Sequence, residues 1–227
     1  MLTKKKTSLL LVVTASIGFA GACCAENEVQ LEKAKNDVSN ITSLQRGAHN
    51  FVNYCYGCHS LQYVRFNRVG ADLQLSDEQV IKNLMFTGER PTDKMQNAIA
   101  TADAARWFGK APPDLSLIAR ARGTDYLYTF LKSFYIDSSR PTGMNNRVLP
   151  GAAMPNVLWE LQGLQYKEEE GKVVEGGDVE KHSTGLKPKP GSVGKLSPEE
   201  FDGFVRDTVN FLDYVGEPIQ LERRRIG

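Results

Sequence analysis

The sequence has little excess charge of either sign. Its 227 residues include 28 Lys and Arg and 27 Asp and Glu, a formal net charge of +1 with histidine neutral. A nucleic-acid-binding domain usually shows a basic excess that is clustered on one face or helix. We therefore expect no nucleic-acid partner.

The sequence also lacks an apolar run that is long enough to cross a bilayer comfortably, which takes about 20 residues. Its main uncharged run covers residues 7–22, follows three lysines at positions 4–6, and is succeeded by Ala25. This pattern is typical of a secretory signal peptide, so we predict a leader over residues 1–25 and a mature chain that begins near Cys23 or Glu26. Acylation of Cys23 in a lipoprotein is the alternative. Loss of the leader removes three lysines and no acids, which changes the net charge from +1 to −2.

Cysteine is scarce, and two of the four cysteines, Cys23 and Cys24, lie at the end of the predicted leader. The other two, Cys55 and Cys58, are followed directly by His59. A C-x-x-C-H run is the attachment site of a c-type haem. Each thiol can add to one vinyl group, and the imidazole is then presented to the iron. We expect one covalently bound haem c.

Two other kinds of site use a cysteine pair at this spacing. A zinc site needs two more ligands, and the only other thiols are in the predicted leader. A thioredoxin-like redox pair gives no reason for the adjacent His59. Because thioether bonds to a haem would use Cys55 and Cys58, we also expect no structural disulfide.

The sixth ligand of the iron must come from elsewhere in the chain. A methionine there raises the reduction potential, whereas an open position suggests ligand binding or catalysis. Met154 follows the small residues 151–153, which let a backbone lie close to a porphyrin plane. We favour Met154, with Met144 of the same loop as the alternative. The other candidates are Met85, interpreted as core packing, Met95, His49, which is too near the motif along its helix, and His182, interpreted as solvated.

Apolar periodicity predicts a mainly α fold. Apolar residues recur at three- and four-residue steps over 43–54, which predicts the helix that delivers the cysteines. Ser197-Pro198-Glu199-Glu200 is the best helix start, with Ser as the N-cap and Pro at the first helical position. We expect the helix that follows to pack across the first and close the haem shell. Shorter helices are predicted after a capping box at Ser76, from Asp114 to Gly123, and from Thr124 as a cap through Leu127, Phe130, Leu131 and Phe134.

Three stretches lack such periodicity. Residues 89–113 are interpreted as irregular chain, and 137–155 as an ordered loop rich in Pro, Gly and Asn. Residues 165–196 are rich in Glu, Gly, Lys and Pro and are interpreted as an exposed insertion, either a β-hairpin or a mobile loop. Its surface is either simply solvated or a docking surface.

Several segments, in this order, carry a resemblance to a known family. The chain resembles cytochrome c1, the haem subunit of ubiquinol:cytochrome c oxidoreductase, from about residue 29 to the last residue. The segments are CYGCHSLQYVRFNRVG, APPDLSLIARARG, DYLYTFLKSFY, RPTGMNN, LPGAAMPNVLWELQG and FLDYVGEPIQLERRRIG.

This resemblance implies a cytochrome c-like helical domain over residues 26–221, with long loop insertions, around one haem. It implies that Cys55 and Cys58 bind the haem covalently, with His59 and Met154 as axial ligands. By the same resemblance Arg120 meets a haem propionate, a carboxylate that suits guanidinium. One of Pro112 and Pro113 offers its carbonyl to the ring N–H of His59, a contact that orients the imidazole.

The resemblance also implies partners and a location. Family members carry a C-terminal membrane helix after a segment like the arginines of 222–227, and we expect these residues to be the flank of an anchor that lies beyond this sequence. The expected partners are the cytochrome b and Rieske iron–sulfur subunits, with cytochrome c as electron acceptor. The expected location is the periplasmic face of the bacterial inner membrane.

The expected function is one-electron transfer in a respiratory chain, with no substrate bond made or broken by this chain on its own. One alternative is a freely diffusing exported c-type carrier. Another is a haem enzyme or gas sensor with an open sixth position, which would bind carbon monoxide rapidly. A stable six-coordinate ferrous form that ignores carbon monoxide would favour a carrier.

Overall fold

A computed structural model of the chain describes residues 29–173 and 179–227, with the side chains of 169–184 left out. The predicted leader, with Cys23 and Cys24, and the His182 side chain therefore lie outside the described part. The fold is mainly helical, as predicted. The helices are α1 (Ile41–Tyr54), α2 (Phe66–Asp72), α3 (Asp77–Asn83), α4 (Thr101–Phe108), α5 (Ile118–Arg122), α6 (Thr124–Lys132), α7 (Trp159–Gln162), α8 (Pro198–Gly216) and α9 (Gln220–Ile226). The strands are β1 (Leu61–Arg65), β2 (Lys94–Met95), β3 (Phe134–Ile136), β4 (Met144–Asn146), β5 (Gln165–Val173) and β6 (Val179–Pro188).

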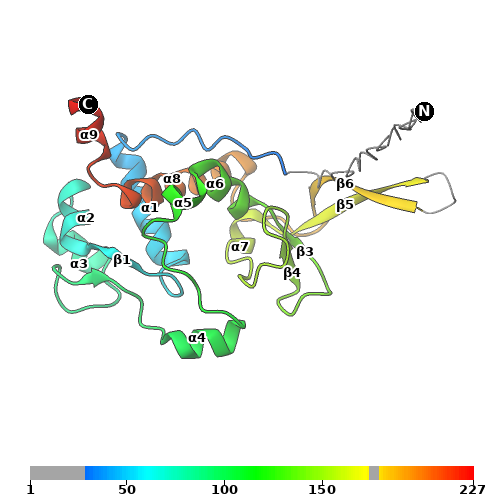
Figure 1. Ribbon diagram of the computed structural model, residues 1–227, viewed down its shortest axis with the longest axis horizontal. Coiled ribbons are helices and arrows are strands. Elements are labelled where there is room, and N and C mark those ends of the chain that lie inside the picture. The colour runs from blue at the N-terminus through cyan, green and yellow to red at the C-terminus, as the bar shows by residue number, and fades with distance from the viewer. Residues whose placement is uncertain (1–28, 174–178) are drawn as a thin grey trace, which may run out of the picture.

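The crossing of α1 and α8 forms the centre of the molecule, as the sequence predicts (Figure 1). Gly47 of α1 lets the two backbones approach closely, since a Cβ added there would lie 2.0 Å from the carbonyl oxygen of Asp207. Phe51 of α1 and Phe211 of α8 are fully buried beside the crossing, with ring centroids 5.8 Å apart. Helices α5 and α6 pack against α8 as well.

A polar cluster crosses the same helix interface. The buried Asp207 carboxylate accepts hydrogen bonds from the Ser43 hydroxyl (2.6 Å) and from Nε and Nη2 of Arg46 (2.5 and 3.0 Å). Asn210 donates from Nδ2 to the Ser43 hydroxyl at 2.9 Å. A buried carboxylate is costly unless it is paired and hydrogen-bonded, and here both conditions hold, so the cluster fixes how α1 and α8 meet.

The helix starts confirm two predicted caps and correct a third. Ser76 and Ser197 each form a complete capping box, and Pro198 occupies the first turn of α8. The prediction that Thr124 caps α6 is wrong, because Gly123 is the N-cap and Thr124 is already helical. Gly123 has φ +86°, a backbone conformation that glycine adopts without steric cost.

Short paired strands occur in segments that were predicted to be irregular because they lack apolar periodicity. Residues 89–113 contain β2, antiparallel to β1, and helix α4, so the prediction of irregular chain there is wrong in part. Helix α4 has no side-chain cap at Ala100, and a two-residue strand has no detectable period, which is why neither was predicted. Phe134, expected on a helix, begins β3 instead, which pairs with β4 inside the predicted 137–155 loop.

The predicted insertion is a β-hairpin, as one of the two interpretations had it. Its strands β5 and β6 are antiparallel, from Gln165 opposite Pro188 to Val173 opposite Val179. The hairpin extends away from the helical centre, on the opposite side from α9 (Figure 1). Among the described residues, no helix combines the length and the apolar character needed to cross a membrane.

Candidate functional site

The C-x-x-C-H motif forms a tight turn at the end of α1. Cys55 is the C-cap of that helix, and its N–H donates to the Phe51 carbonyl at 2.9 Å. The N–H groups of Cys58 and His59 both donate to the Cys55 carbonyl, at 3.1 and 2.9 Å. Because these bonds close helical turns, the two cysteines and the histidine are held as one compact unit.

Tyr56, inside the motif, anchors this turn to the rest of the fold. Its ring is buried between Phe51 and Phe66, at centroid distances of 6.0 and 6.3 Å. Its hydroxyl lies 2.6 Å from Oγ1 of Thr87 and donates to the carbonyl oxygen of Gln96 at 2.9 Å. Sequence reasoning gave Tyr56 no role, since a tyrosine between two cysteines carries no signal of what it will reach.

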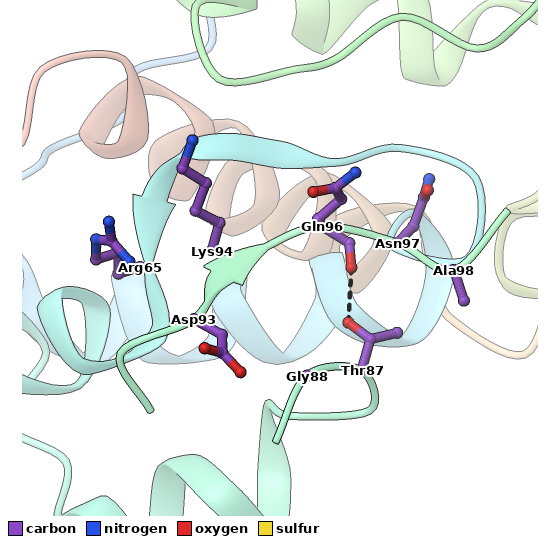
Figure 2. Close-up of a pocket in the computed structure, with 8 residues that line it drawn as sticks. All are labelled: Arg65, Thr87, Gly88, Asp93, Lys94, Gln96, Asn97 and Ala98. Atoms are coloured by element: carbon purple, nitrogen blue, oxygen red, sulfur yellow. Dashed lines mark hydrogen bonds between the residues drawn. The ribbon is translucent and has the colours of Figure 1, made fainter. Parts of the chain in front are cut away.

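The segment that receives Tyr56 lines a surface pocket of about 540 Å³. Figure 2 shows the Thr87 hydroxyl directed at the Gln96 carbonyl oxygen, a hydrogen bond of 2.7 Å, beside β2. None of the predicted site residues lines this pocket, which is formed by Arg65, Thr87, Gly88, Asp93, Lys94, Gln96, Asn97 and Ala98. The pocket shares Thr87 and Gln96 with the contacts that hold Tyr56.

The His59 imidazole is oriented by the Pro113 carbonyl. Nδ1 lies 2.7 Å from that oxygen, and because a carbonyl only accepts, Nδ1 carries the proton and donates it. Burial lowers the pKa of His59, opposed by the Pro113 hydrogen bond and the nearby Asp114 carboxylate. A neutral ring with a proton on Nδ1 leaves the lone pair of Nε2 free to bind a metal.

Contacts on either side of Pro113 hold it in place. The Leu115 N–H donates to the Ser60 carbonyl at 2.9 Å. The Asp114 carboxylate accepts from the N–H groups of Gln62 and Ser116, each at 2.9 Å. Of the two prolines named from the sequence, Pro113 thus makes the contact to His59.

The Cys55 and Cys58 thiols are free and half-buried. Burial raises the pKa of the Cys55 thiol to about 12, and the neighbouring Cys58 adds to the effect, so the thiol is neutral. Within the described part of the chain, no group of three His, Cys, Asp or Glu side chains is placed to hold a metal ion. The two thiols and the neutral imidazole of His59 are the groups through which a c-type haem is attached.

Met154 is half-buried and packs against the main core, as do Cys55 and Ile118. The alternative, Met144, lies in β4 opposite Ile136. Met95 is fully buried, Met85 packs against the core, and His49 is exposed on α1.

The loop that carries Met154 is held by Asn145, Asn146 and Arg140. Sequence reasoning missed these three residues, although an Asn pair in a Pro- and Gly-rich loop is a recognisable turn signal.

Arg120 lies on α5, next to the end of α8. Its Nη1 is 3.5 Å from the Glu217 carboxylate, and its side chain is 58% exposed. The methylene stem crosses Gly216, where an added Cβ would lie 3.2 Å from Cγ of Arg120. This guanidinium therefore retains exposed donors for a further carboxylate.

A C-x-x-C-H turn on a helical frame, with its histidine oriented by a backbone carbonyl, is the arrangement of a c-type cytochrome. The chain belongs to the cytochrome c1 family, whose profile matches residues 33–175. It is thus a haem protein of electron transfer.

Relatives with known names support this assignment. The chain is 46% identical to "Cytochrome c1" of Allochromatium vinosum over 97% of this chain and 86% of that protein. It is 45% identical to "Ammonia monooxygenase gamma subunit" of Nitrosomonas europaea, over 88% and 79% of the two chains. It is 27% identical to "Cytochrome b/c1" of Bradyrhizobium diazoefficiens, over 82% of this chain and 30% of that longer protein.

Proposed function

We propose that this chain carries one haem c, bound covalently through Cys55 and Cys58 with His59 and Met154 as axial ligands, and transfers electrons within a quinol-oxidising complex. The observation that carries the proposal is the 2.7 Å contact from Nδ1 of His59, the residue after Cys58, to the Pro113 carbonyl. A carbonyl or carboxylate that receives the second ring nitrogen is the usual partner of a metal-binding histidine.

The haem supplies a one-electron couple between ferric and ferrous iron. The chain's own residues prepare the site for it. Burial favours the neutral form of His59, and the Pro113 carbonyl sets the direction of its ring. The backbone hydrogen bonds of the helical turn hold the two cysteines close together. A methionine opposite the histidine raises the reduction potential, and the exposed guanidinium of Arg120 suits a propionate.

The family and the Bradyrhizobium relative named for cytochromes b and c1 support a place in such a complex. In our proposal the chain accepts an electron from the Rieske iron–sulfur subunit, beside cytochrome b. It passes the electron to a cytochrome c at the periplasmic face of the bacterial inner membrane. The chain itself makes and breaks no substrate bond.

Covalent attachment is tested by mass spectrometry of the exported protein after denaturation. We expect a mass that includes one haem, and we expect a Cys55→Ala, Cys58→Ala double variant to release its haem into acid acetone. Release of the haem from the wild-type chain would contradict the proposal.

The axial ligand is tested by Met154→Leu, which keeps a similar apolar volume and removes the sulfur. We expect a lower reduction potential, since axial ligands set haem potentials over about 0.8 V, and new binding of carbon monoxide to the ferrous protein. Met144→Leu is the matched control and should change neither. If instead the wild-type ferrous protein already binds carbon monoxide rapidly, the sixth position is open and the chain is a sensor or an enzyme.

A further inference from the structure

The loop that carries Met154 is clamped by two side chains of the β3–β4 hairpin. Gly151, three residues before Met154, donates its N–H to Oδ1 of Asn145 at 2.8 Å. Its carbonyl oxygen accepts from Nη2 of Arg140 at 3.0 Å. Gly151 has φ +79°, in the left-handed region that glycine enters without steric cost. Both polar groups of one backbone residue are therefore held by side chains from elsewhere.

The clamp itself stands on a well-bonded hairpin. Asn145 lies opposite Tyr135 in the β3–β4 register, and its Nδ2 donates to Asp137 at 2.8 Å. The backbone N–H of Arg140 donates to the Asp137 carbonyl at 3.1 Å. Because both clamp residues are tied to Asp137, their positions relative to each other are fixed.

A second asparagine holds the beginning of the same loop. Asn146 is fully buried, and its Oδ1 accepts from the N–H groups of Val148 (2.9 Å) and Leu149 (3.1 Å). Its Nδ2 donates to the Phe130 carbonyl of α6 at 2.8 Å. The chain that leads to Met154 is thus attached through Asn146 to the helical core and through Asn145 to the hairpin.

We propose that Asn145 and Arg140 are positioning residues for Met154. This inference rests on the proposed function, in which the Met154 thioether is an axial ligand. A loop that is already ordered loses little conformational freedom when its methionine binds the iron. This is the advantage of preorganisation. Without the clamp the released loop gains freedom, and a competing ligand displaces the thioether more easily.

The test is a competition for the ferric iron in the holoprotein. Imidazole is titrated in, and loss of the sulfur-to-iron absorption band reports displacement of the thioether. Asn145→Ala removes the acceptor for the N–H groups of Gly151 (2.8 Å) and Asn146 (2.9 Å). We expect imidazole to bind about tenfold more tightly, which corresponds to about 1.4 kcal/mol.

Arg140→Ala is the second variant and keeps the inference testable if Asn145→Ala folds poorly. Nε of Arg140 is buried and has no hydrogen-bond partner among the described residues, so the substitution also removes an unsatisfied donor. We expect imidazole to bind about fivefold more tightly. Thr142→Ala is the matched control in the same hairpin. Its hydroxyl donates to the Met144 carbonyl at 3.2 Å and does not hold Gly151, so imidazole affinity should stay within about twofold of wild type.

Met154→Leu in the same assay separates the two claims. If it abolishes the band while Asn145→Ala and Arg140→Ala bind imidazole like wild type, the positioning role is wrong and the proposed function stands. If Met154→Leu retains the band, the ligand in the proposed function is wrong, and the positioning inference falls with it.

Discussion

Gly47→Ala tests whether the α1–α8 crossing limits the stability of this fold. An added Cβ would lie 2.0 Å from the Asp207 carbonyl oxygen and 2.7 Å from Cβ of Phe211. A carbon and a carbonyl oxygen in contact are about 3.3 Å apart, so the helices would have to separate by roughly 1 Å. Asp207 cannot shift independently, because Arg46 and Ser43 bind its carboxylate.

The magnitude follows from two opposing effects. Overpacking a core costs about 1–3 kcal/mol, and we expect the upper value here because both clashing atoms belong to helix α8. Alanine is also the better helix former, by about 1 kcal/mol. The net loss in the free energy of unfolding should be about 2 kcal/mol.

Gly203→Ala in α8 is the matched control, since a Cβ there would meet no atom of another described segment within 4 Å. It should raise the free energy of unfolding by up to about 1 kcal/mol, so the two variants should differ by about 3 kcal/mol. The measurement is urea unfolding of the holoprotein followed by far-ultraviolet circular dichroism. Equal stability of the two variants would refute the reasoning, because their propensity gains are the same and only the packing differs.

Two further predictions concern helix ends and acid pH. Ser197→Ala removes the side chain that accepts from the Glu200 N–H and should lower the free energy of unfolding by about 1 kcal/mol, whereas Glu199→Ala in the same turn should cost less; equal urea midpoints would argue against the cap. Hydrogen bonding to Lys33 and to the Ala34 N–H lowers the pKa of Asp125 below 3.8. The ionised carboxylate therefore contributes fully to the free energy of unfolding above pH 3.8, and this contribution is lost as the pH falls through the lower pKa of the folded state. Asp125→Asn should therefore lose less stability than wild type between about pH 4 and about pH 2, and parallel urea midpoints over that range would contradict this.

Local features of this protein could be predicted because neighbouring residues decide them. The spacing of Cys55, Cys58 and His59 already implies a helical turn, and the structure closes it with backbone bonds to the Cys55 carbonyl. The capping boxes at Ser76 and Ser197 involve partners three residues away. The apolar periods of α1 and α8 were long enough to identify both helices and to predict that they pack together.

Tertiary structure decided the features whose partners are distant in sequence. Pro112 and Pro113 are adjacent, and Pro113 is the one whose carbonyl meets His59, 54 residues away. The hydrogen bonds that Leu115 and Asp114 make to Ser60 and Gln62 hold it there. The pairing of β1 with β2 could not be predicted either, because the two strands are distant in sequence.

The support of the Met154 loop combines near and distant partners, since Asn145 binds Gly151 six residues away and Asn146 binds Phe130 sixteen residues away. The sequence predicted a loop over residues 137–155 and favoured Met154 within it, because small residues beside a methionine are visible in a single segment. That Asn145 would bind Gly151 depends on how the chain after β4 folds back, because the 2.8 Å hydrogen bond between them forms only in the folded loop. Adjacent residues carry the chemistry of the motif, so the sequence alone reveals it, whereas the orientation of the His59 ring depends on a long-range hydrogen bond that forms only when the chain is folded.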